Sequence, residues 1–156
     1  VIHPSHLKYE QSRKMPYLAM MDQLRKYLST PSSVMIIIGY SFGDQHLNDV
    51  IIQSLQGSPS TAVFALMYGP LKEYLNAVTL AKGRGNLCIL AKDGTVTGTR
   101  EEKWREADEQ PDSFLPSGII EWKKGTKKDD PWKASLKLGD FNKFGVFLQD
   151  ITGKKV

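Results

Sequence analysis

The side chains best suited to chemistry gather in one short stretch, GYSFGDQHLN, between Gly39 and Asn48. An apolar, isoleucine-rich run from Met35 to Gly39 precedes it, which is typical of a strand buried on both faces in a parallel sheet. An amphipathic pattern follows and ends near Gly57 and Pro59. We therefore expect a strand, a glycine-bearing turn and a helix, the arrangement at which α/β proteins place their ligands.

The turn matches the G-x-S-x-G pattern of serine hydrolases, with Ser41 in the position of the nucleophile. In those enzymes the acid and then the histidine of the triad come after the serine in the chain. The histidines of this sequence are His3, His6 and His46, and His46 lies inside the expected helix that follows the turn. Because no later histidine can serve as the base, a serine hydrolase is the weaker interpretation of the turn.

The other interpretation of the turn is a dinucleotide site. Gly39 allows a sharp turn and close approach of a ligand. The hydroxyls of Tyr40 and Ser41, with the free backbone N–H groups, could hold phosphate or ribose oxygens. The full G-x-G-x-x-G fingerprint is missing. Asp44, at the expected helix N-cap, would repel a pyrophosphate, so it favours a capping role or a bond to a ribose hydroxyl. In the simplest alternative, Asp44 only caps and Ser41 only turns.

The chain up to residue 98 alternates between helical and strand patterns. Residues 1–12 are expected to form a loop, and a helix is expected from Pro16, in its first turn, to about Ser29. Buried strands are predicted at Thr61–Tyr68 and Leu87–Ala91, and a helix with Leu71, Leu75, Val78 and Leu80 facing inward is predicted over Leu71–Lys82. This alternation predicts an α/β fold with a parallel sheet and flanking crossover helices.

The composition changes after about Thr99. The stretch from Arg100 to Pro116 is polar and highly charged, with Trp104 expected to anchor one helical turn. Alternating apolar and polar residues from Phe141 to Ile151 predict an edge strand. We therefore divide the chain into a domain at 1–98 and a charged C-terminal extension at 99–156, which could contact a partner or a second copy.

Composition narrows the class of protein. The chain has 156 residues, 40% of them hydrophobic, and a net charge of +4 from charges mixed along the sequence. Mixed charges favour a solvated surface over a nucleic-acid stripe. Cys88 is the single cysteine, which excludes an internal disulfide and fits a reducing cytoplasm. No apolar run is long enough to cross a membrane. The opening Val1-Ile2-His3-Pro4 suggests a fragment of a longer protein.

The segment from Ile37 to Asn48 closely resembles the sirtuin-like domain of bacterial NAD-consuming defence proteins. In that family a strand ends in Gly-Tyr-Ser-Phe-x-Asp-x-His-Ile/Leu-Asn, and this sequence carries Asp44, His46 and Asn48 in that order. The segment from Pro4 to Tyr9, followed by a helical pattern, also looks like the part of the family that precedes this strand. The resemblance covers about residues 1–98, which it implies to be the C-terminal half of such an NAD-binding domain.

The resemblance implies a Rossmann-like fold that binds NAD and cleaves the bond between nicotinamide and ribose, depleting NAD in antiphage defence. Gly39 and Ser41 would line the ribose and phosphates, and Tyr40, Phe42, Asp44 and His46 would complete or support that wall. Tyr68 and Gly69 would approach the adenosine, and the loop at Asp93 and Gly94 would lie beside the adenine. Such proteins form homo-oligomers or act with a partner, for example a HerA-type ATPase.

The catalytic residues of the family do not match this sequence. The family's catalytic histidine comes from an earlier part of the fold, so it is expected upstream of Val1, and neither His3 nor His6 is assigned as catalytic. With Cys88 alone, the four-cysteine zinc module of deacylating sirtuins cannot form, and no metal is expected. A non-catalytic assembly module on a sirtuin-like scaffold therefore remains the alternative function.

Overall fold

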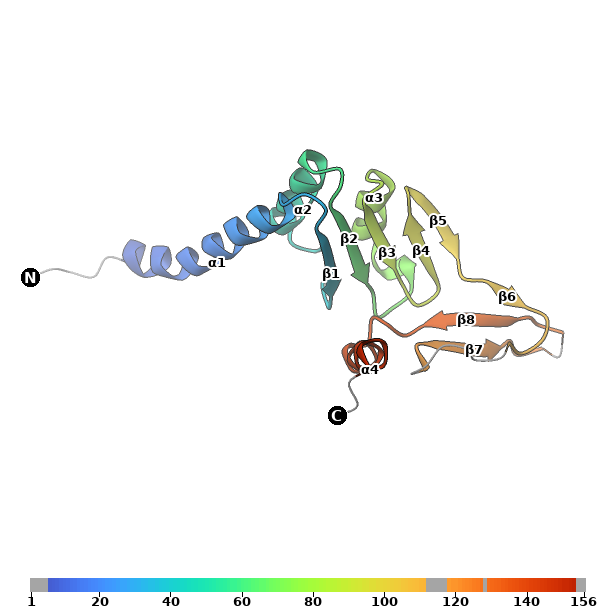
Figure 1. Ribbon diagram of the computed structural model, residues 1–156. Coiled ribbons are helices and arrows are strands. Elements are labelled where there is room, and N and C mark those ends of the chain that lie inside the picture. Colours follow the sequence, from blue (N-terminus) through green and yellow to red (C-terminus); the bar gives the residue numbers. More distant parts are fainter. Residues whose placement is uncertain (1–5, 112–117, 128, 154–156) are drawn as a thin grey trace, which may run out of the picture.

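The helices and strands of the chain were located in a computed structural model, which describes residues 6–111, 118–127 and 129–153 and the side chains from residue 16 onward (Figure 1). In chain order the elements are α1 (His6–Leu28), β1 (Val34–Ile38), α2 (Gln45–Gly57), β2 (Ala62–Leu66), the 3₁₀ helix η1 (Leu71–Glu73), α3 (Leu75–Lys82), β3 (Leu87–Leu90), β4 (Gly94–Thr97), β5 (Arg100–Lys103), β6 (Glu106–Ala107), β7 (Ile120–Lys124), β8 (Trp132–Leu136) and α4 (Phe141–Thr152).

The main sheet has five strands in the order β1-β2-β3-β4-β5. The first three strands are parallel and the last two are antiparallel additions. The α/β class and the three predicted parallel strands are therefore confirmed, and the sheet as a whole is mixed. Strands β4 and β5 form a hairpin across position 98, so residues 100–103 belong to the same sheet as the residues before them. A second sheet, with the order β6-β8-β7, follows.

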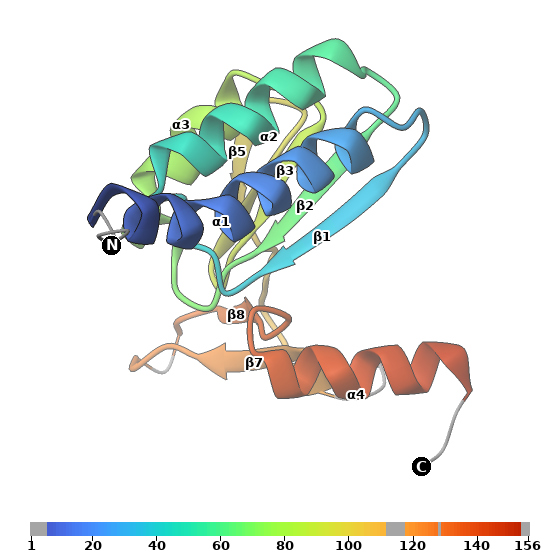
Figure 2. The same ribbon diagram turned by 90° about the vertical axis from the view of Figure 1, so that its left-hand side faces the viewer.

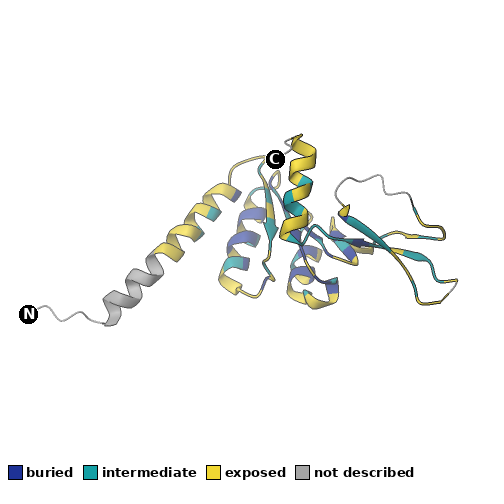
Figure 3. Cartoon of the chain, turned by 90° about the horizontal axis from the view of Figure 1, so that it is seen from below, coloured by how far each residue is buried: buried dark blue, intermediate teal, exposed yellow. Residues whose placement is uncertain are grey.

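The hydrophobic core lies between the main sheet and helices α2 and α3, which cover the same face of it (Figure 2). The largest fully buried side chains include Leu28, Phe42, Ile51, Leu55, Leu87 and Ile89. The inward stripe predicted for α2 is confirmed by buried Val50, Ile51 and Leu55. Figure 3 shows that the burial is concentrated in this part of the chain, whereas α4 carries exposed and half-buried residues only.

The expectation that the first strand is buried on both faces is wrong. Strand β1 is at the edge of the sheet, and Val34 and Ile36 on its outer face are 55% and 48% exposed. Met35 and Ile37, on the inner face, pack against the core. An apolar run cannot by itself distinguish a central strand from an edge strand with one uncovered face.

The first helix begins earlier than predicted. Helix α1 starts at His6, and Pro16 lies inside it, so the expected loop over residues 1–12 is wrong from His6 onward and lies outside the described residues before it. A proline removes one backbone hydrogen bond but does not always end a helix. The good helix formers before Pro16, which include leucine, lysine, glutamate, glutamine and arginine, outweigh that loss. In Figure 1 this first part of α1 extends beyond the rest of the domain.

The predicted helix at Leu71–Lys82 is divided into two. The 3₁₀ helix η1 is held at its start by the Asp93 carboxylate, which accepts a hydrogen bond from the Leu71 N–H at 2.8 Å. Helix α3 then begins at Leu75, which is 69% exposed and not inward as predicted. The break between η1 and α3 changes which residues face the core. The prediction assumed one continuous helix and therefore placed Leu75 on the wrong face.

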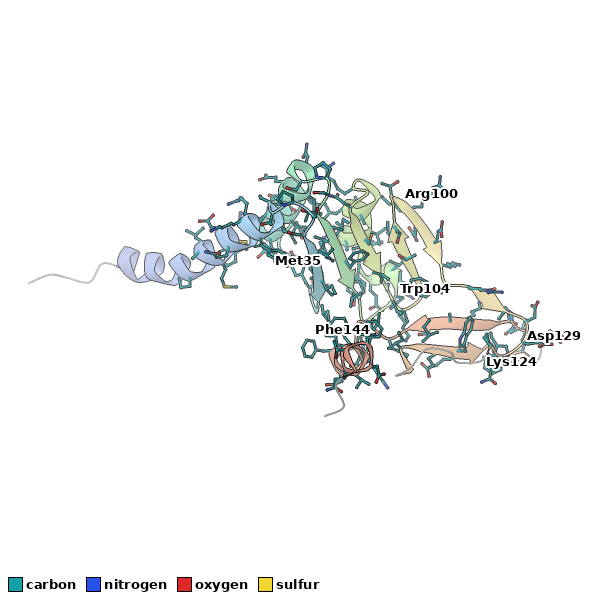
Figure 4. The ribbon with its side chains drawn as sticks, in the orientation of Figure 1. Met35, Arg100, Trp104, Lys124, Asp129 and Phe144 are labelled. Atoms are coloured by element: carbon teal, nitrogen blue, oxygen red, sulfur yellow. The ribbon has the colours of Figure 1, made fainter. Side chains whose placement is uncertain are left out.

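The charged stretch after Thr99 forms strands, which corrects the expected helical turn at Trp104. Trp104 follows β5, and its indole Nε1–H donates to the Ala91 carbonyl at 2.8 Å (Figure 4). This bond ties the start of the extension to the end of β3. Strand β5 is exposed along its whole length, and so its charged residues face solvent while its backbone pairs with β4.

The predicted edge strand at Phe141–Ile151 is the amphipathic helix α4. Asp140 caps it by accepting hydrogen bonds from the N–H groups of Asn142 and Lys143, and Gly153 ends it with a φ of 67°. Phe141, Phe144 and Leu148 recur at helical spacing as well as in partial alternation. In a short segment the helical and the strand periodicity of apolar residues overlap. The N-cap residue Asp140 and the C-cap residue Gly153 are the signals that indicate a helix.

The extension is packed directly on the end of β2 through Gly139. A Cβ atom at Gly139 would overlap the carbonyl of Met67 and approach the backbone nitrogen of Tyr68 to 2.5 Å. A backbone hydrogen bond from the Leu136 N–H to the Lys92 carbonyl at 3.0 Å also joins the extension to the residues after β3, and a bond from the Lys137 N–H to the Ile119 carbonyl at 2.7 Å holds the extension together internally. The loop between β8 and α4 therefore forms part of the surface at the carboxyl end of the sheet.

Replacing Gly139 by alanine is expected to push this loop away from β2. We expect the free energy of unfolding to fall by about 1–3 kcal/mol, since the added methyl group overlaps backbone that cannot move aside cheaply. Urea unfolding measures the change. Gly145→Ala, inside α4 with open space around its Cβ, is the matched control and should be neutral or slightly stabilising. Equal effects of the two substitutions would contradict the close contact.

Candidate functional site

The turn between β1 and α2 has an unusual backbone that fixes its shape. Gly39 has a φ of 76°, which glycine adopts without steric cost, and Phe42 has a φ of 59° although it is not a glycine. The Phe42 side chain is completely buried, and its ring lies 4.8 Å from that of Tyr40, centroid to centroid. Burial of Phe42 therefore holds the turn in a conformation that leaves Ser41 exposed beside Gly39.

The Asn48 side chain stabilises the β1–α2 turn through hydrogen bonds. It is 4% exposed, and its amide Nδ2 donates to the Phe42 carbonyl at 3.0 Å. Its Oδ1 accepts from the Tyr40 hydroxyl at 2.8 Å, and that hydroxyl also reaches the Asp44 carbonyl at 3.0 Å. The oxygen and the nitrogen of the buried Asn48 amide therefore both hold the β1–α2 loop against the start of helix α2.

Asp44 is the N-cap of α2, as the sequence predicts. One carboxylate oxygen accepts from the Leu47 N–H at 3.1 Å and the other accepts from the Tyr17 hydroxyl of α1 at 3.2 Å. The bond from the Leu47 N–H, together with that from Tyr17, lowers the pKa of Asp44 below its ordinary value. Partial burial and the facing carboxylate raise the pKa of the Tyr17 hydroxyl. Asp44 is therefore a charged cap that joins α1 to α2.

A cavity of about 240 Å³ opens where β1 and β2 end side by side. It is lined by Gly39, Tyr40, Ser41, Leu66, Met67, Tyr68 and Tyr74. Four of the seven residues predicted to contact a cofactor are thus brought together here: Gly39, Tyr40, Ser41 and Tyr68. The carboxyl ends of adjacent parallel strands are the usual place for a ligand in this class of fold.

The other three predicted residues do not line this cavity. Phe42 supports the turn from within the core, and Asp44 caps α2. His46 lines a separate and larger groove of about 520 Å³ between α1 and α2, together with Tyr17, Leu18, Met21, Asp22, Arg25, Asp49, Val50 and Gln53. This groove lies on the helical side of the turn, so His46 is not placed to contact a ligand at Gly39.

A second, smaller cavity of about 100 Å³ adjoins the first through Tyr68. It is lined by Tyr68, Lys92, Leu136, Lys137 and Asp140. Tyr68 is 73% exposed, so its ring stands between the two cavities rather than in the core. The Lys137 amine is 2.7 Å from the Glu121 carboxylate, and this hydrogen-bonded amine lowers the pKa of Glu121. The β8–α4 loop thus brings polar side chains beside the turn.

Sequence reasoning missed the residues that come to the site from outside the motif. Tyr74 accepts a hydrogen bond from the Gly69 N–H at 3.1 Å and forms one side of the first cavity. Lys92 comes from the β3–β4 loop and Lys137 and Asp140 come from the β8–α4 loop, and no short spacing connects them to the turn. Asn48 is part of the motif, and its role in holding the turn could have been predicted, because an asparagine within the apolar stripe of a helix requires buried hydrogen-bond partners.

The loop at Asp93 and Gly94, predicted to lie beside an adenine, has a structural role. The Asp93 carboxylate holds η1, and a Cβ at Gly94 would approach the Glu102 carbonyl oxygen to 2.5 Å. Neither residue lines the two cavities at the turn. The neighbouring Lys92 lines the second of these cavities.

Ser41 lacks the surroundings of a hydrolase nucleophile. In a nucleophile elbow the serine itself occupies the strained position, whereas the positive φ values here belong to Gly39 and Phe42. Within the described ranges, no histidine or carboxylate is hydrogen-bonded to the Ser41 hydroxyl; His46 lines the α1–α2 groove, and the Asp44 carboxylate bonds to the Leu47 N–H and the Tyr17 hydroxyl. The exposed Ser41 hydroxyl can donate and accept hydrogen bonds.

Among the side chains that the structure describes, no group of three or more histidine, cysteine, aspartate or glutamate residues could hold a metal ion. In the same part of the chain, no helix combines the length and apolar character needed to cross a membrane. No protein-family model and no curated protein matches this chain.

Proposed function

We propose that this chain binds NAD at the β1–α2 turn and forms the cofactor-binding wall of a sirtuin-like, Rossmann-like domain that cleaves NAD between nicotinamide and ribose. The observation that carries the proposal is the cavity at the adjacent carboxyl ends of two parallel strands, which Gly39, Ser41 and Tyr68 help to line. The sequence motif from which NAD binding was predicted therefore contributes residues to the lining of a cavity, at the usual ligand position of this class of fold.

Each residue of the wall has a chemical task in this proposal. Gly39 has no side chain and allows the backbone to approach the cofactor closely. The exposed Ser41 hydroxyl can donate to, or accept from, a ribose or phosphate oxygen. The Tyr68 ring offers a face for stacking or for contact with the sugar. Cleavage requires a further group that acts on the nicotinamide side, and the resemblance places the catalytic histidine of the family outside this wall.

Asp44 supports the site indirectly. Both its carboxylate oxygens are engaged, by the Leu47 N–H and the Tyr17 hydroxyl. A carboxylate at this position also occupies the helix N–H groups that would otherwise bind a phosphate. The phosphates of NAD would therefore lie away from the start of α2, on the side of Tyr68.

An assembly module is the second candidate function, favoured by apolar surface outside the site. Val34 and Ile36 on the outer face of β1 are about half exposed, and Phe141 and Ile151 of α4 are 74% and 60% exposed. Exposed apolar surface of this kind is common where proteins meet. This function does not require NAD, so ligand binding distinguishes it from the first proposal.

The test uses Ser41→Ala and Asp44→Ala in the full-length protein, measuring NAD affinity by calorimetry and nicotinamide release by chromatography. We expect Ser41→Ala to weaken NAD binding by about three- to tenfold, the effect of one lost hydrogen bond. Asp44→Ala should lower both affinity and thermal stability, because it releases the cap that positions the turn. Wild-type affinity and turnover in both variants would make the site assignment wrong. Ester hydrolysis that is lost in Ser41→Ala would favour the hydrolase instead.

A further inference from the structure

The first cavity contains no positive charge among its lining residues, although NAD carries two phosphates. Its lining is apolar or hydroxyl-bearing, and Asp44 nearby is negative. An anionic ligand bound only there would lose hydration without a compensating cation. A cation must therefore come from beside the cavity if the ligand is to be a dinucleotide.

Two lysines are present in the adjoining cavity, and their situations differ. Lys137 already forms an ion pair with Glu121, at 2.7 Å, so its charge is largely balanced. Lys92 is exposed and forms no ion pair with any described residue. The Asp140 carboxylate, on the third side, is engaged by the N–H groups of Asn142 and Lys143 at the start of α4. Lys92 is thus the uncompensated charge of this small cavity.

Lys92 is also held in place by the fold around it. Its backbone N–H donates to the Gly69 carbonyl at 3.1 Å, directly beyond Tyr68, and its carbonyl accepts from the Leu136 N–H at 3.0 Å. These bonds join the end of β3 to the β2 loop and to the C-terminal extension. The β8–α4 loop of the extension lines the second cavity, which shares Tyr68 with the first, and Gly139 of the same loop lies against the backbone of Met67 and Tyr68.

We propose that the β8–α4 loop of the extension is the second wall of the nucleotide cleft, and that Lys92 binds a phosphate of the ligand beside Tyr68. Asp140, on the same wall, opposes that anion and limits the affinity. The inference rests on the proposed function for the identity of the ligand. It adds a phosphate-binding residue and a wall that the NAD motif at Gly39 does not contain.

The experiment compares the binding of ADP-ribose, AMP and adenosine by isothermal titration calorimetry. Lys92→Met should weaken ADP-ribose and AMP by about tenfold, since a charge-assisted hydrogen bond is lost, and should leave adenosine unchanged. Asp140→Asn, which keeps a side chain able to cap α4, should strengthen the two phosphate-bearing ligands by about two- to threefold. Lys124→Met is the matched control, an exposed lysine without an ion pair among the described residues, at the far end of β7 (Figure 4).

The outcomes separate this inference from the proposed function. If wild-type protein binds ADP-ribose and Lys92→Met binds it equally well, the phosphate contact is wrong while the NAD site stands. An equal loss for adenosine and ADP-ribose in Lys92→Met would also overturn the contact, because the residue would then act on the shape of the cleft. If wild-type protein binds none of the three ligands, the proposed function itself fails.

Discussion

Replacing Gly39 by valine is expected to abolish measurable NAD binding while the chain still folds. A Cβ at Gly39 would meet no atom within 4 Å, so the fold has room for it, but the two methyl groups would stand in the cavity that Gly39 lines. The φ of 76° adds a backbone cost of about 1–2 kcal/mol for any residue with a Cβ. We expect the NAD dissociation constant to rise by at least thirtyfold, roughly the loss of 2 kcal/mol of contacts.

Gly98→Val separates strain from ligand binding in this experiment. Gly98 also has a positive φ, of 55°, and open space around its Cβ, and it lies in the β4–β5 turn away from both cavities. The two variants should lose similar stability, seen as a fall in melting temperature of about 2–8 °C for a chain of this size. Only Gly39→Val should lose NAD binding. Loss of binding in both, or in neither, would contradict the position of the cofactor at Gly39.

Replacing Asn48 by leucine is expected to produce the largest loss of stability among changes at the site. Leucine has a similar volume, so the packing is kept, but the Phe42 carbonyl loses its bond from the Asn48 amide. Tyr40 keeps only its bond to the Asp44 carbonyl. A buried acceptor without a partner costs about 1–3 kcal/mol, and chemical unfolding monitored by tryptophan fluorescence should show a loss of about 2 kcal/mol.

A second buried polar residue on α2 provides the control for Asn48. The hydroxyl of Ser54 is buried and has no hydrogen-bond partner within the described structure. Ser54→Ala should therefore be neutral or slightly stabilising, in contrast to Asn48→Leu. We also expect Asn48→Leu to weaken NAD binding, because the released turn no longer presents Ser41 in one place. A stable Asn48→Leu variant with wild-type affinity would mean that the amide does not hold the turn.

The part of the fold that sequence predicted best is the part with the strongest local signals. The β1-turn-α2 unit has an apolar run, a glycine at a positive φ, an N-cap aspartate and a helical stripe, and all of these agree. The apolar runs of β2 and β3 were equally clear. The apolar run at Met35–Ile38 did not reveal whether other elements cover both faces of the strand. That depends on the arrangement of the whole sheet and not on the sequence of the strand.

The predictions after residue 99 were wrong for two reasons. The residues of α4 fit both helical and strand periodicity, and the charged residues of β5 have little intrinsic preference for a strand. Phe141, Phe144 and Leu148 fit a helix, while the neighbouring valine and glutamine also allowed alternation, and only the caps at Asp140 and Gly153 distinguish the two. Strand β5 is charged and exposed, and it forms because β4 offers a backbone partner. Lys92 and Asp140 come together in the second cavity through long-range packing, which no spacing in the sequence encodes.

The most direct measurement of the central claim is the map of backbone amide shifts in an isotope-labelled sample titrated with NAD. We predict that the largest changes fall on Gly39, Ser41 and Tyr68, with smaller changes at Lys92, and that residues of the α1–α2 groove such as Arg25 and Gln53 do not move. Changes confined to that groove, or the absence of any change at millimolar NAD, would contradict the assignment of the β1–α2 turn as a cofactor site.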